Sequence, residues 1–337
     1  MSNLQFLWFL LIGVLFSGFF FLEGFDFGIG MAVRFFAKNR DERDTIIQTI
    51  GPHWDGNEVW LITAGGAMFA SFPMWYASLF SGYYIVLFLI LVALIFRGVS
   101  FEFRANMQTD QWRNFWEWAA TIGSFCAAFL FGMMFTSMIQ GVPMDSQGNI
   151  FGTFTTYVNW FSLVGGVAVS LLCFIHGLNF IRLKTSGELR DRAQKWSKVL
   201  YPVLLAGEVV FVILLMMYTD FFSRKPISTW SILVALVIFT LAAWWGAQAR
   251  HDWVSFISSG LSLISVVVLI FNGLFPRVMI ATTNAKSILI KDASSSPYTL
   301  HLMTILTFSI LPIVLIYFVW SYWVFYKRLK SPAAAKE

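Results

Sequence analysis

The sequence predicts an all-α integral membrane protein, a bundle of nine transmembrane helices with the N-terminus outside and the C-terminus cytoplasmic. The mean hydropathy is +0.71 and only 12% of the 337 residues are charged, against about 25% in ordinary soluble domains. Apolar runs of about 18 residues or more, long enough to cross a hydrocarbon core of about 30 Å, recur along the whole chain. Because lipid offers the backbone no hydrogen bonds, each run is expected to form a helix.

Nine apolar runs, interrupted by charged residues, proline or polar clusters, mark the expected spans. The first run starts directly after Asn3, without the basic segment and cleavage site of a signal peptide, so we interpret it as a permanent span. We expect one polytopic membrane domain over residues 1–329 and a short polar cytoplasmic tail over 330–337. The expected spans cover residues 4–36, 54–72, 76–96, 115–139, 157–180, 199–218, 227–246, 253–271 and 301–325.

Lysine and arginine are divided unevenly between alternate loops. One set of loops holds 17 of the 23 basic residues, the opposite set holds five, and Arg97 lies at the end of an expected span. Since cytoplasmic loops carry the excess of basic residues, this bias places the C-terminus in the cytoplasm and requires an odd number of spans. Topology also explains the net charge of +5, so no nucleic-acid partner is expected.

The cysteines and histidines form no ligand pattern. The two cysteines lie inside apolar runs without CxxC spacing, and the four histidines show no HxxxH, HxxH or ExxH pairing. His53, His251 and His301 lie at expected helix ends, where a solvated imidazole is ordinary. His176 lies inside a span and is expected to be a hydrogen-bonded interior side chain. We therefore expect no metal site and no haem ligated directly by this chain.

An acidic stripe is expected on the first helix. At 100° per residue, Glu23, Asp26 and Gly30 fall within about 60° of one another. Gly24 and Gly28 form a small-xxx-small face that lets a neighbouring helix approach closely. Ionisable groups at membrane depth are costly unless paired or hydrated, so they are the first functional candidates. The alternative is a tight helix crossing in which the carboxyl groups serve packing alone.

A second acidic pair lies near the cytoplasmic end of the second expected span. Asp55 and Glu58 are three residues apart in the segment PHWDGNEVW at 52–60, so both carboxyl groups lie along one side of the helix. Partly buried carboxyl groups close to one another can load and release protons near neutral pH, which makes this pair a candidate proton entry site. The alternative is capping of the helix N-terminus and interaction with its macrodipole.

Two further ionisable residues need an explanation. Arg97 closes the third expected span, where snorkelling to the lipid headgroups accounts for it without a function. Glu208 is the tenth residue of the sixth expected span, close to the membrane midplane, and is expected to be neutral or paired.

Several motifs resemble those of subunit II of cytochrome bd-type quinol oxidases. The similarity runs nearly end to end, and the segment from Pro52 to Gly66 is its most specific part. The motifs are GFDFGIG at 24–30, GPHWDGNEVWLITAGGAMFASFP at 51–73, FSGYY at 80–84, FRGVSFEFR at 96–104, WRNFW at 112–116, QGVP at 140–143, FP at 275–276 and SYWVFY at 321–326.

The resemblance implies a terminal oxidase of the bacterial cytoplasmic membrane that oxidises quinol and reduces dioxygen to water. It implies nine spans, a partner subunit I that ligates two haems b and one haem d, and in some members a single-helix small subunit. It places the aspartate matching Asp55 on a cytoplasmic proton route at the subunit interface, with Asp26 in the same polar neighbourhood. Trp60 and Arg97 match positions associated with an oxygen route.

Taken together, we expect a proton path through Asp55, Asp26, Glu58 and Glu23, and a proton-motive force generated by vectorial proton uptake. Glu58 and Glu208 depart from the family pattern, which implies glutamine and an apolar residue there. A bound quinone or lipid remains open. Two alternatives also remain: a secondary transporter with a midplane site, and a purely structural subunit without a proton role.

Overall fold

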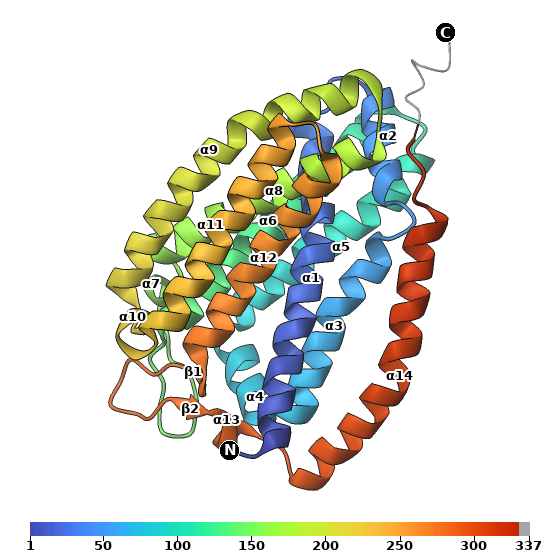
Figure 1. The fold of residues 1–337 in the computed structure, drawn as a ribbon. Coiled ribbons are helices and arrows are strands. Elements are labelled where there is room, and N and C mark those ends of the chain that lie inside the picture. Colours follow the sequence, from blue (N-terminus) through green and yellow to red (C-terminus); the bar gives the residue numbers. More distant parts are fainter. Residues whose placement is uncertain (330–337) are drawn as a thin grey trace.

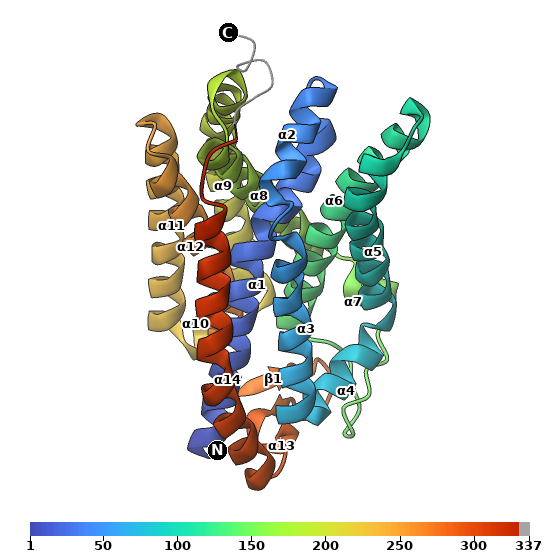
Figure 2. The ribbon, with the colours of Figure 1, turned by 90° about the vertical axis from the view of Figure 1, so that its right-hand side faces the viewer.

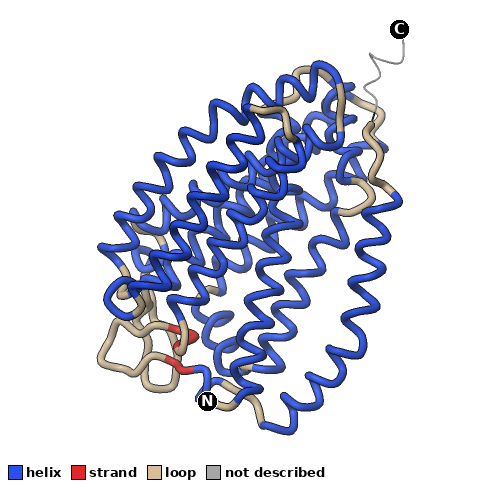
Figure 3. Tube along the Cα trace, viewed as in Figure 1, coloured by secondary structure: helices blue, strands red, loops and turns tan. Residues whose placement is uncertain are grey.

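The computed structural model describes residues 1–329, so the expected polar tail at 330–337 lies outside the described residues. The described chain is helical almost throughout (Figure 3), and this confirms the predicted all-α class. Two short antiparallel strands, β1 (Arg277–Met279) and β2 (Ile288–Leu289), were not predicted. The helices are α1 (Asn3–Phe35), α2 (Arg40–Ile50), α3 (Trp54–Ser71), α4 (Pro73–Gly82), α5 (Tyr84–Asn106), α6 (Asp110–Gln140), α7 (Phe154–Tyr157), α8 (Trp160–Lys184), α9 (Gly187–Tyr218), α10 (Phe221–Arg224), α11 (Pro226–Gln248), α12 (Asp252–Leu274), α13 (Ile290–Ala293) and α14 (Pro297–Val324).

Eight helices of the described chain are long and apolar enough to cross a membrane: α1, α5, α6, α8, α9, α11, α12 and α14. The second expected span, α3, has 18 residues and is not among them, because its acidic residues and glycines lower its hydropathy. It still runs beside α1 in the bundle (Figure 2). One end of the bundle carries β1 and β2 and is called the strand end below; the other carries α2 and is called the α2 end (Figure 1).

The third expected span, residues 76–96, is wrong at both ends. The chain forms two helices there, α4 and α5, which meet at Tyr83. Both halves are apolar, so hydropathy alone does not reveal the break. At the break, the Tyr83 hydroxyl lies 3.0 Å from the Ser137 hydroxyl. Helix α5 continues to Asn106, and Arg97, the residue expected to end the span at the lipid headgroups, is fully buried inside the protein.

Helical structure at the α2 end extends beyond the apolar runs. Helix α2 forms in an expected loop and is capped by the Asn39 side chain, which accepts a hydrogen bond from the backbone of Glu42. Helix α9 starts at Gly187, well before the expected residue 199, and its polar first turns bury Leu189 and Ala193. Hydropathy marks contact with lipid, so it misses helix turns that pack on protein.

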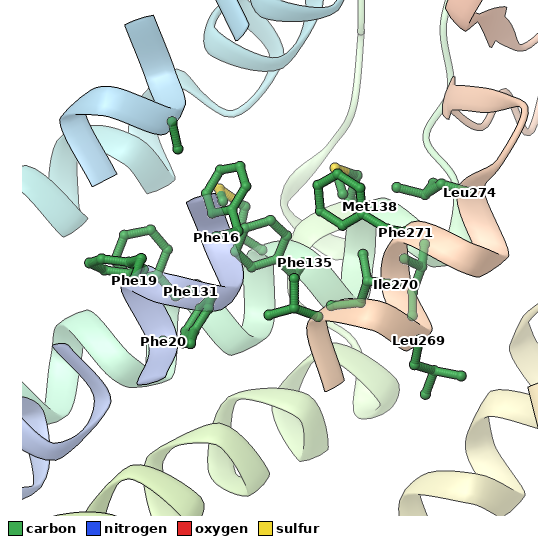
Figure 4. Packing of buried hydrophobic residues seen from close by; sticks show 14 of the residues in the cluster. Phe16, Phe19, Phe20, Phe131, Phe135, Met138, Leu269, Ile270, Phe271 and Leu274 are labelled. Atoms are coloured by element: carbon green, nitrogen blue, oxygen red, sulfur yellow. The ribbon is translucent and has the colours of Figure 1, made fainter. Parts of the chain in front are cut away.

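Helix α1 runs through the centre of the bundle and carries much of the aromatic core (Figures 1 and 4). Phe16 packs edge-on against Phe135 of α6 with ring centroids 5.4 Å apart, and Phe19 packs similarly against Phe131 at 5.4 Å. Such edge-to-face pairs contribute about 0.5–1.5 kcal/mol each beyond the area they bury. The core therefore holds α1 and α6 in a fixed relation to each other.

The expected glycine face of α1 is confirmed. A side-chain carbon at Gly28 would collide with the carbonyl oxygen of Cys173 and the backbone of Gly177 on α8, and one at Gly24 would press on Leu263 of α12. These glycines let α8 and α12 approach α1 closely. The acidic residues on the remaining sides of α1 consequently face α3 and α5.

Helix α14 lies at the edge of the bundle beyond α3 (Figures 1 and 2). Of its 28 residues only Leu300 is buried. The segment after the helix is tied to the α2 end: the Lys184 ammonium donates to the Phe325 carbonyl, the Leu329 amide donates to the Lys184 carbonyl at 2.8 Å, and Arg328 pairs with Asp252 at 3.0 Å. These contacts set the position of the end of α14.

Candidate functional site

Three helices bring four charged side chains into one cluster in the protein interior. Glu23 and Asp26 extend from α1, Glu58 from α3 and Arg97 from α5. The Arg97 guanidinium nitrogen Nη1 lies 2.5 Å from a Glu23 oxygen and 2.5 Å from a Glu58 oxygen. Glu23, Asp26 and Arg97 are fully buried, whereas the Glu58 side chain keeps 24% of its surface exposed. We call these four residues the charged cluster.

Arg97 therefore does not snorkel, and this expectation was wrong. Its guanidinium stacks over the rings of Phe27 and Phe101 at 5.1 and 5.3 Å and serves as the counter-ion of two carboxyl groups. One guanidinium balances one carboxylate, while the cluster contains three carboxyl groups. Since uncompensated charge in a protein interior costs several kcal/mol, proton occupancy is the simplest way to balance the other two.

The structure brings together three of the four residues expected on the proton path. Glu23, Asp26 and Glu58 meet in the charged cluster, but Asp55 does not join it. Asp55 is exposed on the first turn of α3, where its carboxylate accepts a hydrogen bond from the Gly56 amide at 2.7 Å. Asp55 and Glu58 are one helical turn apart, so the exposed acid and the partly exposed acid follow the same side of α3.

Sequence reasoning missed Asn57 and Tyr322. The fully buried Asn57 side chain donates from Nδ2 to Asp26 at 2.7 Å, and its Oδ1 accepts from the Tyr322 hydroxyl of α14 at 2.8 Å. The signal for Asn57 was available, because it is a strongly polar residue between the two acids of the PHWDGNEVW segment. No local signal marked Tyr322, which is 265 residues away.

His53 is buried, contrary to the expectation of a solvated imidazole, while His251 and His301 are exposed as expected. The His53 ring stacks flat on Tyr322 with centroids 4.0 Å apart and 8° between the planes. Burial and the nearby Lys184 ammonium lower the pKa of His53 to about 4. His53 is therefore neutral at physiological pH, which suits a ring that packs on an aromatic face.

His176 is a satisfied interior side chain, as expected. Its Nε2 lies 3.0 Å from the Phe21 carbonyl oxygen, so Nε2 carries the proton, and Nδ1 lies 2.7 Å from the Ser259 hydroxyl. Both ring nitrogens are thus occupied, and the side chain does not fit haem ligation. Within residues 1–329 no group of three His, Cys, Asp or Glu side chains is arranged to hold a metal ion.

Glu208 lies beside an apolar cavity of about 400 Å³ between α6, α8, α9 and α12. One of its oxygens accepts a hydrogen bond from the Thr240 hydroxyl at 2.6 Å. Thr240 is therefore the hydrogen-bond partner of this acid, which was expected to be paired or neutral. Trp60 lies elsewhere, in an open groove of about 450 Å³ between α1, α3 and α14, against Gly18 and Phe318. Glu208 and Trp60 are both separate from the contacts of the charged cluster.

The fold and the site define a polytopic membrane protein whose buried acids surround one arginine. Comparison with known proteins gives the family. The model of the cytochrome bd terminal oxidase subunit II family matches residues 4–325, and the chain belongs to that family. Its members form a complex with subunit I, and this chain is therefore a subunit of a haem-bearing quinol:oxygen oxidoreductase.

Two relatives support the assignment, and one solved structure has a similar fold. The chain is 45% identical over 331 residues to cytochrome bd ubiquinol oxidase subunit 2 of Bacillus subtilis, covering 98% of each chain. It is 35% identical to cytochrome bd-I ubiquinol oxidase subunit 2 of Escherichia coli, covering 97% of this chain and 95% of that one. The structure of bd oxidase from Geobacillus thermodenitrificans contains a chain with a similar fold, at a TM-score of 0.72, 15% identity and coverage of 96% and 99%.

Proposed function

We propose that this subunit carries protons from the cytoplasm toward the oxygen-reducing centre of its complex. The observation that supports this most is the charged cluster, in which Glu23, Asp26 and Glu58 outnumber the single cation Arg97 in a buried environment. Such a group is costly to maintain for packing alone. Its arrangement suits repeated uptake and release of protons.

The route that we propose starts at Asp55 and continues through Glu58 to Glu23 and Asp26. Asp55 is exposed on this chain and Glu58 is partly exposed on the same side of α3. That side is where we propose that subunit I docks, so that Asp55 and Glu58 border the shared interface. A proton that enters between the two subunits would then reach acids that are inaccessible from water on this chain.

We propose nine spans, with the N-terminus outside and a single polytopic membrane domain. Helix α3 would be the ninth span, because it runs beside α1 through the bundle and its polar residues contact protein. The start of α1 and the end of α14 lie at opposite ends of the bundle (Figure 1), as an odd number of crossings requires. The α2 end, which holds most basic residues, would face the cytoplasm of a bacterial cell.

We propose that subunit I ligates both haems b and the haem d of the complex, since His176, the histidine inside a span, already uses both ring nitrogens. These haems would supply the chemistry that joins quinol oxidation to dioxygen reduction. The residues of this chain would hold and pass protons beside them. Proton uptake from the cytoplasmic side would conserve about 2.3 kcal/mol per charge at 100 mV.

Two apolar spaces suit the remaining ligands. The groove beside Trp60 is lined almost entirely by apolar side chains of α1, α3 and α14, and we propose it as an approach for dioxygen, which is itself apolar. Arg97 does not line this groove, so it could affect dioxygen only indirectly, through the residues that it contacts in the charged cluster. The cavity beside Glu208 suits the apolar chain of a lipid or quinone. A single-helix small subunit would add to the lipid-facing surface.

Membership of an oxidase family argues against a secondary transporter, so the remaining alternative is a structural subunit without a proton role. The test is Asp55→Asn in the assembled complex, with Asp41→Asn, an exposed acid at the same end, as the control. We expect quinol oxidase turnover to fall by about tenfold or more while the haem absorption spectrum is retained, and Asp41→Asn to behave as wild type. Unchanged turnover in Asp55→Asn would favour the structural alternative.

A further inference from the structure

We propose that Asn57 and Tyr322 are positioning residues that set the proton affinity of Asp26. This inference rests on the proposed role of Asp26 in proton transfer and extends the site to α14. The residues form a chain of hydrogen bonds from the edge of the bundle inward, from the Tyr322 hydroxyl to Asn57 Oδ1 at 2.8 Å and from Asn57 Nδ2 to Asp26 at 2.7 Å. The chain joins the last helix of the protein to the first.

The hydrogen-bond donors fix the orientation of the Asn57 amide. The amide NH₂ faces Asp26 and the amide oxygen faces α14, which is the orientation that suits the charged form of Asp26, because a carboxylate only accepts hydrogen bonds. The Tyr322 hydroxyl then donates to that oxygen and stabilises this orientation. An amide does not itself carry protons readily along a path, so Asn57 acts on Asp26 by donating to its charged form. Asn57 therefore favours release of the proton from Asp26.

Contacts at the α2 end hold Tyr322 and the segment that follows it. His53, at the start of α3, stacks flat on its ring. Lys184 of α8 holds the Phe325 carbonyl, and Arg328 pairs with Asp252 of α12. Leu300, near the other end of α14, is the only fully buried residue of the helix, so these contacts at the α2 end help to set where the Tyr322 hydroxyl lies. The position of the last helix is thereby transmitted to a buried acid on the first.

Three other charged side chains lie near Asp26. Glu23 lies on the same helix, Glu58 on α3 and Arg97 on α5. None of them contacts Asn57 or Tyr322 through a hydrogen bond within the described residues. A change at Tyr322 therefore leaves the ion pairs of Arg97 in place and alters only the hydrogen bond that Asn57 donates to Asp26. This separation makes a selective experiment feasible.

The experiment uses the assembled complex with Tyr322→Phe, which removes one hydroxyl, and with Asn57→Ala. Tyr317→Phe is the matched control, because Tyr317 lies on the same helix, is 63% exposed and makes no side-chain hydrogen bond to any residue of 1–329. Loss of the donor makes Asp26 hold its proton to higher pH. The alkaline limb of the turnover profile should therefore move upward by roughly half to one pH unit in Asn57→Ala, with a smaller shift in the same direction in Tyr322→Phe.

A double variant tests whether Tyr322 acts through Asn57. Once Asn57 is alanine, removal of the Tyr322 hydroxyl should add no further shift, because the connection is already broken. Additive shifts, or a Tyr322→Phe profile identical to wild type, would overturn the proposal. The haem spectrum of each variant reports assembly. Tyr322→Phe keeps the ring that stacks on His53, so it provides the test even where Asn57→Ala fails to assemble.

Infrared difference spectra between two pH values separate this inference from the function on which it rests. The Asp26 carboxyl band is the band that disappears in Asp26→Asn. We expect it to shift in Tyr322→Phe and to stay unchanged in Tyr317→Phe. An unshifted band, or no Asp26-dependent band, would contradict the inference. Normal turnover in Asp26→Asn together with a shifted band would instead contradict the proton path while the positioning role stands.

Discussion

Arg97 of α5 supplies the positive charge of the charged cluster, and its partners are brought to it by two other helices, α1 and α3. Sequence spacing identified Glu23 and Asp26 on one face of a helix, because that relation is local. It gave no means to place Arg97, whose partners lie on α1 and α3, or Tyr322, whose partner is 265 residues away. A buried arginine and one that snorkels look the same in a hydropathy profile.

Replacement of Arg97 by leucine should destabilise the subunit strongly. It would leave the Glu23 and Glu58 carboxyl groups without their counter-ion, and breaking a buried ion pair from one side costs about 3–5 kcal/mol. We expect little assembled complex and a lower thermal unfolding temperature. Arg40→Leu is the control, since Arg40 is exposed and its contact to Asp110 is 3.8 Å.

The double variant Arg97→Leu with Glu23→Gln should regain part of that stability, because it removes one of the uncompensated acids. Equal assembly of Arg97→Leu and wild type, measured by the yield of haem-bearing complex, would show that the arginine is not the counter-ion of the cluster.

At the scale of helices, apolar runs located the centres of the spans well and their ends poorly. The run at 4–36 matches α1 within a residue, whereas the run at 76–96 contains the break at Tyr83 and the run at 199–218 omits the first turns of α9. The physical reason is that lipid selects apolar surface, while helix ends are set by capping and by packing on neighbouring protein. The glycine face of α1 was predictable because a small residue is required wherever two backbones approach.

Gly28→Ala should lower stability, although alanine usually favours a helix by about 1 kcal/mol over glycine. The added carbon meets the backbone of α8 at Cys173 and Gly177, which cannot move independently of the helix. Overpacking of this kind costs about 1–3 kcal/mol. Gly207→Ala is the matched control, because among the described residues no atom beyond its own stretch of helix lies within 4 Å of the added carbon.

Thermal unfolding of the purified complex provides the comparison. We expect a lower unfolding temperature for Gly28→Ala and an unchanged or slightly higher one for Gly207→Ala. The reverse order would mean that α1 and α8 are not packed as closely as described.

At the scale of the whole molecule, the bundle surrounds α1 with protein on most sides and leaves α3 and α14 at the edge. This arrangement buries the acids of α1 but keeps Asp55 at the surface, next to Glu58. The sequence identified the acidic residues as candidates for the site and predicted the class of the fold. It did not predict that Asp55 and the charged cluster occupy different environments, since burial depends on how the helices are assembled.

Proton uptake after an oxygen pulse to the reduced complex, followed with a pH-indicator dye, tests the central claim most directly. In Asp26→Asn we expect uptake and turnover to slow together by about tenfold or more, with the haem spectrum retained. Asp292→Asn, an exposed acid at the strand end, should behave as wild type. Proton uptake at the wild-type rate in Asp26→Asn would contradict the account.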